Sequence, residues 1–375
     1  MKVLITGGAG FIGTHLSRRL LQLGHEISVL DNFSPQIHAG KMVLATDLQG
    51  HLRLIVGDVA DPSVLSAALA GTECIVHLAA ETGTGQSMYE VSRYERTNLA
   101  GTALIYELLT KSQAHRVERI VVASSRAIYG EGAYRCPRDG LVFPQPRTSA
   151  EKRAGSFDPL CPVCGGGCEM APTPETAPLQ PTSFYGLTKQ VQEQMTLLFG
   201  KVLGIPSFAL RYQNVYGPGQ SLHNPYTGIL AIFSNLARTG QLIRVFEDGQ
   251  ESRDFVYIDD VVGATASCLT QDATGCETVN VGSDERVSVL QVANEINAFF
   301  GNRSGVRITG AFREGDIRHG MADLTKACAV LDYEPKWSFQ AGLQSFLSWA
   351  TENELPKDRY EESLAEMKQR GLLSN

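Results

Sequence analysis

Two side chains that could move a proton together, Tyr185 and Lys189, stand four residues apart at the start of a predicted helix. This spacing places the phenol and the ammonium on one face of the helix. A nearby ammonium favours the phenolate, so it lowers the pKa of the tyrosine from about 10 toward neutrality. Such a phenol can take a proton from an alcohol and return it later. An isolated Tyr-x-x-x-Lys occurs by chance in many helices, so the pair needs support from the rest of the chain.

That support begins at the other end of the sequence, where Gly8, Gly10 and Gly13 form a G-x-G-x-x-G motif, with Gly7 fitting the looser G-x-x-G-x-x-G. An apolar stretch of strand type precedes the glycines, and a pattern with helical period follows from Phe11. Glycines in this context allow a tight turn and a close approach of the backbone to a pyrophosphate, which lies at a helix N-terminus. The pattern predicts a dinucleotide-binding loop.

An acidic residue follows at the distance that this interpretation requires. Residues 26–30 form a second predicted strand, which ends at Asp31, 18 residues beyond Gly13. A carboxylate near this offset binds the adenosine ribose. No Arg or Lys follows before Lys41, so a 2′-phosphate would meet an uncompensated negative charge. The sequence therefore favours NAD over NADP, against the alternative of a surface turn with a solvated Asp.

Further strand ends provide the remaining candidate cofactor contacts. Asp58 follows the predicted strand at 52–56 and could bind adenine or cap the helix that starts near Pro62; the two alternatives are equally good. The fourth strand runs into Ala79-Ala80, whose small side chains allow close approach of a cofactor. The expected cofactor-binding residues are Gly7, Gly8, Gly10, Phe11, Ile12, Gly13, Asp31, Asn32, Asp58, Val59, Leu78, Ala79, Ala80, Asn98, Tyr185 and Lys189.

Taken together, the motifs resemble those of the extended short-chain dehydrogenases/reductases, in the group of nucleotide-sugar epimerases and dehydratases. The resemblance runs from Met1 to about Ala350. The matching segments, in order, are Thr6–Gly13, His77–Ala80, Ser124-Ser125 with Tyr129-Gly130, Tyr185 with Lys189, Arg211–Gly219, Arg253–Val261, Asn280–Gly282 and Arg313–Asp316.

The resemblance implies roles for individual residues. Ser125, Tyr185 and Lys189 would be catalytic: Tyr185 as acid and base, Lys189 bonding the nicotinamide ribose. The implied substrate-binding residues are Ser125, Asn214, Arg253, Arg313 and Asp316. Guanidinium groups suit the two phosphates of a nucleotide sugar.

Several of these positions have alternatives. Arg253 could instead form a salt bridge to Asp254 or Asp259, and Arg318 and His319 could also hold substrate. An aromatic residue, Phe246 or Phe255, could stack on the nucleobase, although such residues more often belong to the core.

The residues after Ser125 separate members of the group. Similar dehydratases carry an Asp-Glu pair there, and decarboxylases keep a Glu at the second position. This chain has Arg126 and Ala127, neither of which can move a proton at pH 7. Ser125, Tyr185, Lys189 and NAD remain, and this set is sufficient for epimerisation at C4 of the sugar.

A Cys-rich insertion lies in the 54 residues between Gly130 and Tyr185. Its Cys161-Pro-Val-Cys164-Gly resembles a zinc knuckle, and Cys136-Pro-Arg-Asp139-Gly could be a second, with Asp139 in the place of a Cys. The fourth ligand would be Cys168 or Asp139. Sulfur is the softer ligand and so suits zinc better, which favours Cys168, whereas Asp139 has the better spacing. We favour the set Cys136, Cys161, Cys164 and Cys168. A reduced loop without metal is the alternative. A structural zinc is expected, since hydride transfer from a sugar needs no metal.

The insertion also narrows the resemblance, because Tyr-x-Cys-Pro followed by Cys-Pro-x-Cys-Gly resembles 4-epimerases that interconvert dTDP-L-rhamnose and dTDP-6-deoxy-L-talose. The rival functions are a UDP-sugar 4-epimerase, a 4-ketosugar reductase, and, outside catalysis, an NAD-binding sensor. A sensor would need none of the three catalytic side chains. No residue by itself distinguishes thymine from uracil.

The predicted fold is an α/β Rossmann-type doubly wound parallel sheet with a smaller α/β substrate lobe and the Cys-rich insertion. A length of 375 residues with 43% hydrophobic residues suits two lobes. The expected boundaries are 1–134 for the NAD-binding domain, continued at 175–220 and 252–267, 135–174 for the insertion, and 221–251 and 268–350 for the nucleotide-sugar-binding lobe. Residues 351–375 are expected to form a C-terminal tail that is either a solvated helix or a loose segment.

Composition also limits the partners. A net charge of −7 without long runs argues against nucleic acid and an anionic membrane as main partners. The sequence has no run of about 18 apolar residues, and its first stretch is predicted as a strand rather than a signal peptide. We expect a soluble cytoplasmic protein. The resemblance further implies a homodimer through two long helices near 95–112 and 185–200.

Overall fold

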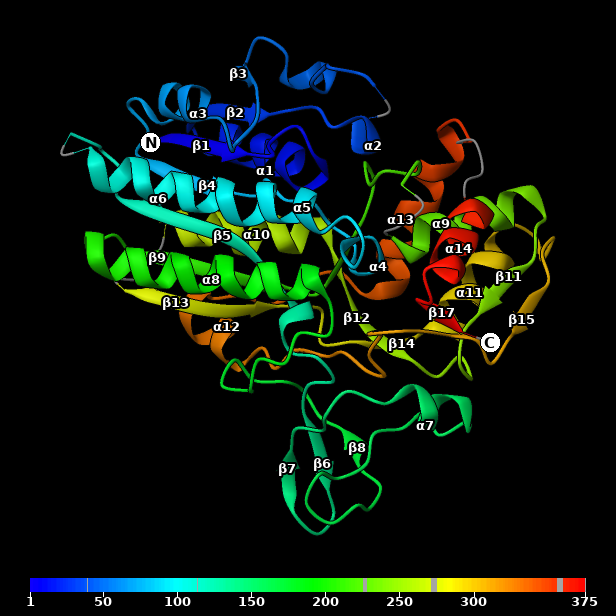
Figure 1. Cartoon of the computed structure of the whole chain (residues 1–375). Coiled ribbons are helices and arrows are strands. Elements are labelled where there is room, and N and C mark those ends of the chain that lie inside the picture. Colours follow the sequence, from blue (N-terminus) through cyan, green and yellow to red (C-terminus); the bar gives the residue numbers. More distant parts are fainter. Residues whose placement is uncertain (39, 113, 225–227, 271–274, 356–359, 375) are drawn as a thin grey trace.

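A seven-stranded parallel sheet forms the centre of the protein in a computed structural model (Figure 1). The structure describes residues 1–375 except 39, 113, 225–227, 271–274, 356–359 and 375, so those parts of the predicted smaller lobe and tail lie outside the described residues. The strand order is β13-β9-β5-β4-β1-β2-β3, and every neighbouring pair is parallel. The strands are β1 (Lys2–Thr6), β2 (Glu26–Asp31), β3 (Arg53–Val56), β4 (Cys74–His77), β5 (Arg119–Ser125), β9 (Ser207–Tyr212) and β13 (Cys276–Val281).

The inner strands are apolar on both faces because helices cover both. Leu4, Ile75 and Ile120 face one core cluster, while Val3 and Val121 face the other. Figure 1 shows α6 (Gly101–Lys111) and α8 (Phe184–Leu203) side by side on one face and α10 (Ile258–Thr270) behind the sheet. This arrangement confirms the predicted doubly wound sheet.

The remaining helices of this part connect the strands. The segment predicted as one long helix near 95–112 begins earlier, because α5, a π-helical turn and α6 follow one another without a break. The elements are α1 (Phe11–Gln22), α2 (Pro35–His38), η1 (Thr46–Leu48), α3 (Pro62–Leu69), α4 (Thr84–Ser87), α5 (Val91–Tyr94), η2 (Glu95–Ala100), η3 (Arg126–Ile128) and α12 (Thr325–Leu331).

A smaller lobe of short sheets and helices lies beyond the carboxyl ends of the central strands (Figure 1). Its sheets have the orders β10-β12-β14, β11-β15 and β16-β17. Its elements are β10 (Asn214–Tyr216), α9 (Ile229–Thr239), β11 (Ile243–Val245), β12 (Ser252–Tyr257), β14 (Arg286–Ser288), α11 (Val289–Phe299), β15 (Val306–Ile308), β16 (Phe312–Arg313), α13 (Phe339–Glu352), α14 (Tyr360–Gln369) and β17 (Leu373–Ser374).

The described part of the C-terminal segment contains a packed helix, so the loose-tail alternative is wrong and the predicted helix is solvated on its outer face only. Helix α14 buries Tyr360, Leu364 and Met367, which share one face, and β17 pairs with β16. The three residues follow the i, i+4, i+7 pattern of an amphipathic helix, but the charges on its outer face dominate the composition.

The Cys-rich insertion forms a small projection below the main body in Figure 1. An antiparallel sheet of order β7-β6-β8 holds it together, from β6 (Tyr134–Cys136), β7 (Gly140–Val142) and β8 (Glu169–Met170). The helix α7 (Ser149–Arg153) starts with a capping box between Thr148 and Glu151. Within the described ranges, the structure contains no helix with the length and apolar character needed to cross a bilayer.

Two helical glycines, one from the glycine motif and one far from it, allow a stability prediction. A Cβ at Gly13 would overlap the Gly8 Cα and lie 2.7 Å from the Gly7 carbonyl oxygen, whereas a Cβ at Gly263 in α10 meets nothing within 4 Å. Gly13→Ala should lower the free energy of unfolding by about 1–3 kcal/mol through overpacking. The control Gly263→Ala should raise it by about 0.5–1 kcal/mol. Urea unfolding measures both, and equal stabilities would contradict the tight packing of the loop.

Candidate active site

A cavity of about 800 Å³ opens where the central strands end and the smaller lobe begins. This is the usual position of a ligand in a doubly wound sheet, and the volume suits a cofactor and a substrate. Most of the predicted site residues line it. They are Gly7, Gly10, Phe11, Ile12, Gly13, Asp31, Asn32, Val59, Leu78, Ala79, Ala80, Ser125, Tyr185, Lys189, Asn214, Arg253, Arg313 and Asp316.

The glycine loop passes very close to the backbone that follows β4. Gly7 has a φ of +67°, and a Cβ there would lie 2.8 Å from the Ala79 amide nitrogen. Asp31 braces the loop, because one carboxylate oxygen accepts a hydrogen bond from the Ala9 amide (3.0 Å) and the other from the Phe33 amide (2.8 Å). The loop therefore keeps a negative charge at the end of β2, where a 2′-phosphate would be repelled.

Three predicted cofactor residues, Gly8, Asp58 and Asn98, do not line the cavity. Asp58 accepts the Ala60 amide at 2.9 Å and lies 3.5 Å from Arg96, while Asp61 is the cap of α3. The helix-capping alternative for Asp58 is therefore wrong.

Asn98 is buried and holds the loop after β4 against α8. Its side-chain oxygen accepts the Glu81 amide at 2.8 Å, and its nitrogen donates to the Glu81 carbonyl and to the Thr188 hydroxyl at 2.9 Å. Because Thr188 precedes Lys189, Asn98 fixes the helix turn that carries the proton-transfer pair.

The three residues predicted to be catalytic, Ser125, Tyr185 and Lys189, come together where α8 crosses the end of β5. Ser183 caps α8, so Tyr185 and Lys189 lie in its first turns. Lys189 is 3% exposed, donates to the Ala123 carbonyl at 2.9 Å, and lies with its nitrogen 6.0 Å from the Tyr185 ring centroid. The Ser125 hydroxyl accepts the Ala127 amide at 3.2 Å.

The pKa values of this pair differ from the simple expectation. Burial raises the pKa of Tyr185, and a hydrogen bond with Ser125 and the charge of Arg126 offset that rise only in part. Burial lowers the pKa of Lys189 to about 7. In this structure burial therefore outweighs the groups that lower the pKa of Tyr185, and burial also weakens the hold of Lys189 on its own proton.

The substrate-side residues lie on the smaller lobe. Arg253 donates to an Asp316 carboxylate oxygen at 2.7 Å, so its salt-bridge partner is neither Asp254 nor Asp259. Arg313 lies with its guanidinium carbon 4.9 Å from the centroid of the Phe246 ring. Arg253, Arg313 and Phe246 all line the cavity, where they could grip a diphosphate and a base.

Three other predicted contacts belong to the framework. Arg318 pairs with Asp158 and Asp248 (2.7 and 2.6 Å), and His319 hydrogen-bonds the Ser252 hydroxyl at 2.8 Å. Neither lines the cavity, so the structure does not place them as substrate ligands. Phe255 borders the cavity but packs mainly against the core rings of Tyr216 and Phe339.

Sequence reasoning missed several residues that line the cavity. In the sequence, Arg126 indicated only that its position lacks a carboxylate. In the structure Arg126 lines the cavity, and its Nε donates to the Asn214 side-chain oxygen at 2.7 Å. Glu251 is 5% exposed, and within the described part of the chain its Oε2 atom has no hydrogen-bond partner. Tyr360 reaches the cavity from the C-terminal helix. No motif identified in the sequence contains Glu251 or Tyr360.

A buried ion network behind the site was also missed. Arg147 donates to Glu131 (2.9 Å), to Glu247 (2.7 Å) and to the backbone carbonyl of Asp316 (3.0 Å). Burial acts to lower the pKa of Arg147, but the two carboxylates raise it above its usual value. Since Arg147 lies between the insertion's strands and the smaller lobe, it holds the loop that carries Asp316.

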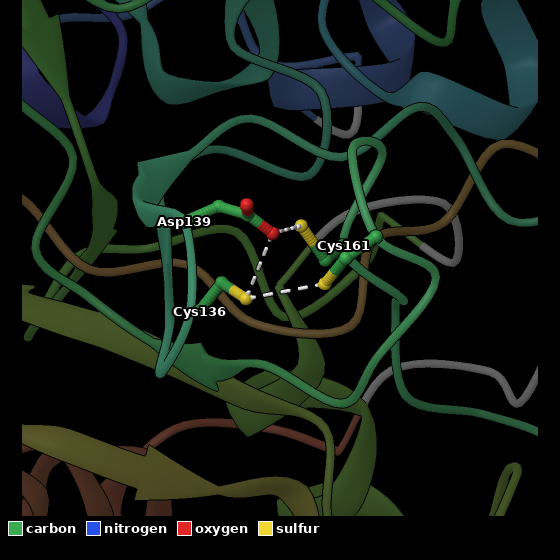
Figure 2. A group of neighbouring side chains, drawn as sticks. Cys136, Asp139 and Cys161 are labelled. Carbon is green, nitrogen blue, oxygen red and sulfur yellow. Dashed lines mark hydrogen bonds between the residues drawn. The ribbon is translucent and has the colours of Figure 1, made fainter.

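The cysteines form a compact cluster at the tip of the insertion. The ligand atoms of Cys136, Asp139, Cys161 and Cys164 all lie within 4.8 Å of one another. Figure 2 shows Asp139 pointing between Cys136 and Cys161, with its oxygen 3.4 and 3.2 Å from their sulfurs. Cys168 lies outside this group, so the geometry favours Asp139, the alternative supported by spacing, as the fourth member.

The cluster fits a tetrahedral metal ion. Metal–sulfur distances of about 2.3 Å place tetrahedral sulfurs about 3.8 Å apart, and a metal-bound oxygen somewhat closer to them. The Cys136 and Cys164 sulfurs are 3.6 Å apart. Three thiolates and one carboxylate suit zinc better than a hard cation such as Mg²⁺.

The fold and the cavity together indicate a dinucleotide-dependent enzyme, with Ser125, Tyr185 and Lys189 lining the cavity where α8 meets the end of β5. The chain matches the NAD dependent epimerase/dehydratase family over residues 3–150 and 161–282. It belongs to this family and is an NAD-dependent nucleotide-sugar epimerase. The resemblance inferred from the motifs is confirmed.

Individual relatives are similar along nearly the whole chain. The dTDP-L-rhamnose 4-epimerase of Burkholderia thailandensis is 41% identical over 352 residues, which are 93% of this chain and 94% of that protein. The UDP-glucose 4-epimerase of Thermotoga maritima, solved with UDP-glucose, has a TM-score of 0.75 at 28% identity, covering 94% of this chain and 99% of that chain. The UDP-glucose 4-epimerase of Thermus thermophilus, solved with NAD, has a TM-score of 0.73 at 27% identity, covering 93% and 98%.

The buried network generates a prediction for Arg147→Met. The change leaves the Glu131 and Glu247 carboxylates buried with one cation fewer, so the free energy of unfolding should fall by about 3–5 kcal/mol. Arg18→Met is the control, because its pair with Asp47 is exposed and should cost less than about 1 kcal/mol. Urea unfolding compares them, and similar losses would contradict the role of Arg147 in joining insertion and lobe.

Proposed function

We propose that this protein interconverts dTDP-L-rhamnose and dTDP-6-deoxy-L-talose by epimerisation at C4. The observation that carries the proposal is the single cavity that Ser125, Tyr185 and Lys189 line together with Arg253 and Arg313. The specific sugar is supported by the 41% identity to the Burkholderia enzyme and by the Cys-rich insertion.

Proton transfer in this mechanism rests on the chain's own side chains. Tyr185 takes the proton from the sugar O4 while Ser125 bonds the same oxygen, and Lys189 orients the nicotinamide ribose. NAD, when bound, supplies reversible hydride transfer at C4. Tyr185 returns its proton after the hydride has come back to the opposite face, so substrate and product have the same oxidation state.

Rotation of the intermediate requires an anchor that does not release it. Asn214, Arg253 and Arg313 would hold the diphosphate, and Asp316 the nucleotide's ribose, while the 4-keto sugar turns about the diphosphate linkage. Guanidinium groups suit this role because they bind phosphate oxygens in pairs. The positions after Ser125 hold Arg126 and Ala127, which disfavours the elimination or decarboxylation of related enzymes.

The direct test incubates purified protein with dTDP-L-rhamnose, dTDP-glucose, UDP-glucose and UDP-galactose in the presence of NAD and without reductant. We expect conversion of dTDP-L-rhamnose alone, without net NADH formation. Tyr185→Phe should lower kcat at least about 100-fold, because the phenol carries the proton. Conversion of a UDP-sugar instead would assign that substrate. Formation of NADH together with a 4-ketosugar would indicate a reductase acting in reverse, and no turnover of any sugar would favour an NAD sensor.

We further propose that the insertion holds a structural zinc ion. Cys136, Cys161, Cys164 and Asp139 would bind it, since their ligand atoms form one compact group. The ion would fix the β6–β7 turn against the Cys161–Cys164 turn. This would support the insertion that delivers Arg147 to the smaller lobe.

Metal analysis of matched variants tests this ligand set. The purified protein should contain about one zinc per chain, Asp139→Ala should lose most of it, and Cys168→Ser should keep it. Retention by Asp139→Ala with loss in Cys168→Ser would show that the sulfur set is correct. A wild-type protein without metal after expression in zinc-supplemented medium would contradict the site altogether.

A homodimer through α6 and α8 is also part of the proposal. The two helices lie side by side on the outside of the sheet. Helix α8 exposes three large apolar side chains, Leu187, Leu198 and Val202, which are 44–65% exposed. Covering such a surface with a second copy is favourable, because it removes apolar area from water.

A further inference from the structure

Arg126 is a partly buried cation that the catalytic scheme above leaves without a role. It follows Ser125 at the end of β5, in the short helix η3, and lines the same cavity as Tyr185. Its Nε donates to the Asn214 side-chain oxygen at 2.7 Å. Arg126 therefore lies between the proton-transfer residues and one of the proposed diphosphate ligands.

Lys189 is poorly placed to supply all of the positive charge that a phenolate needs. Its nitrogen donates to the Ala123 carbonyl at 2.9 Å and lies 6.0 Å from the centre of the Tyr185 ring. A lysine that is buried to 3% exposure readily loses its proton, whereas an arginine keeps its charge in the same surroundings. Arg126 thus provides a permanent charge in the cavity that Tyr185 also lines, and the short helix η3 that carries it packs against α8.

The other groups around Tyr185 do not compete for this role. On α5, Tyr94 donates its hydroxyl to the Thr82 and Gly83 carbonyls, and the neighbouring Arg93 is paired with Glu81 at 2.7 Å.

On the next turn, η2 carries Glu95 and Arg96, and Arg96 lies 3.5 Å from Asp58. From the smaller lobe, Arg253 is neutralised by Asp316 at 2.7 Å.

We propose that Arg126 is a positioning residue for the proton transfer: it stabilises the Tyr185 phenolate electrostatically and holds Asn214 toward the substrate. The charges agree with this geometry. The charge of Arg126 acts to lower the pKa of Tyr185 against the effect of burial, and although burial lowers the pKa of Arg126 to about 10, the guanidinium stays charged at neutral pH. In this role Arg126 deepens the proposed function, on which its contribution to turnover rests.

An ultraviolet titration of the NAD-loaded protein tests the charge without any sugar. The phenolate absorbance of each protein, minus that of its Tyr185→Phe counterpart, reports the ionisation of Tyr185 alone. Arg126→Met should raise the Tyr185 pKa by about one unit, a tenfold loss of phenolate at neutral pH. Arg126→Lys should restore most of the shift, and Arg19→Met, on the exposed side of α1, should have no effect.

The pH profile of epimerisation provides the second readout. The acid limb of kcat/KM should move upward with Arg126→Met by the same amount as in the titration, and return with Arg126→Lys. An unshifted Tyr185 titration in Arg126→Met, with only a higher KM, would overturn the proposal. Failure of every sugar to react would overturn the proposed function instead, because the titration does not depend on turnover.

Discussion

The hydrogen bond from Lys189 to the Ala123 carbonyl joins the two elements on which the chemistry depends. It ties the first turns of α8 to the end of β5, and so sets the distance between Tyr185 and Ser125. The bond lies in a buried environment, where leaving either group unpaired would be costly. Asn98 reinforces this hydrogen bond by holding Thr188, the residue directly before Lys189.

Buried ion pairs behind the cavity keep the substrate-side residues in place. Arg147 and Arg318 share Glu247, and Arg147 also holds the backbone of the loop that carries Asp316. These ions are buried, so their value lies in fixing one arrangement of insertion and smaller lobe more than in net stability. The insertion is thereby part of the structure that shapes the site, although its cysteines lie far from Tyr185 in sequence.

Much of the fold follows from local pattern. Strands that are apolar on both faces and alternate with helices predict a parallel sheet, and the glycines between Gly7 and Gly13 predict the loop because little else fits there. The order and spacing of Ser125, Tyr185 and Lys189 likewise predicted that they lie together, and the three residues line one cavity. The sequence was sufficient to predict the local structure wherever the contacts that determine it are close along the chain.

Long-range partners were not predictable in this way. Arg253 had acidic neighbours in sequence but pairs with Asp316, 63 positions away. The spacing from Cys136 suggested Asp139, but only the fold shows that its carboxylate also reaches Cys161, 22 positions away. The C-terminal helix was judged by its charged surface, whereas its three buried side chains decide where it packs.

The balance between burial and nearby charge at Tyr185 is likewise a property of the folded protein. The sequence shows a phenol and an ammonium one helical turn apart, but not how far each is desolvated. Burial raises the pKa of the phenol and lowers that of the lysine, so additional positive charge has to come from outside the pair. Arg126 became visible as that source only in the structure.

The central claim is that one hydride leaves C4 of the sugar and returns to the same carbon while Tyr185 moves the O4 proton. The most direct measurement uses dTDP-L-rhamnose with deuterium at C4, mixed with an equal amount of substrate labelled with ¹³C, in ordinary water. The account predicts that the product keeps its deuterium at C4, with no transfer to the ¹³C-labelled molecules. Loss of deuterium to water, or its appearance in the ¹³C product, would contradict this mechanism.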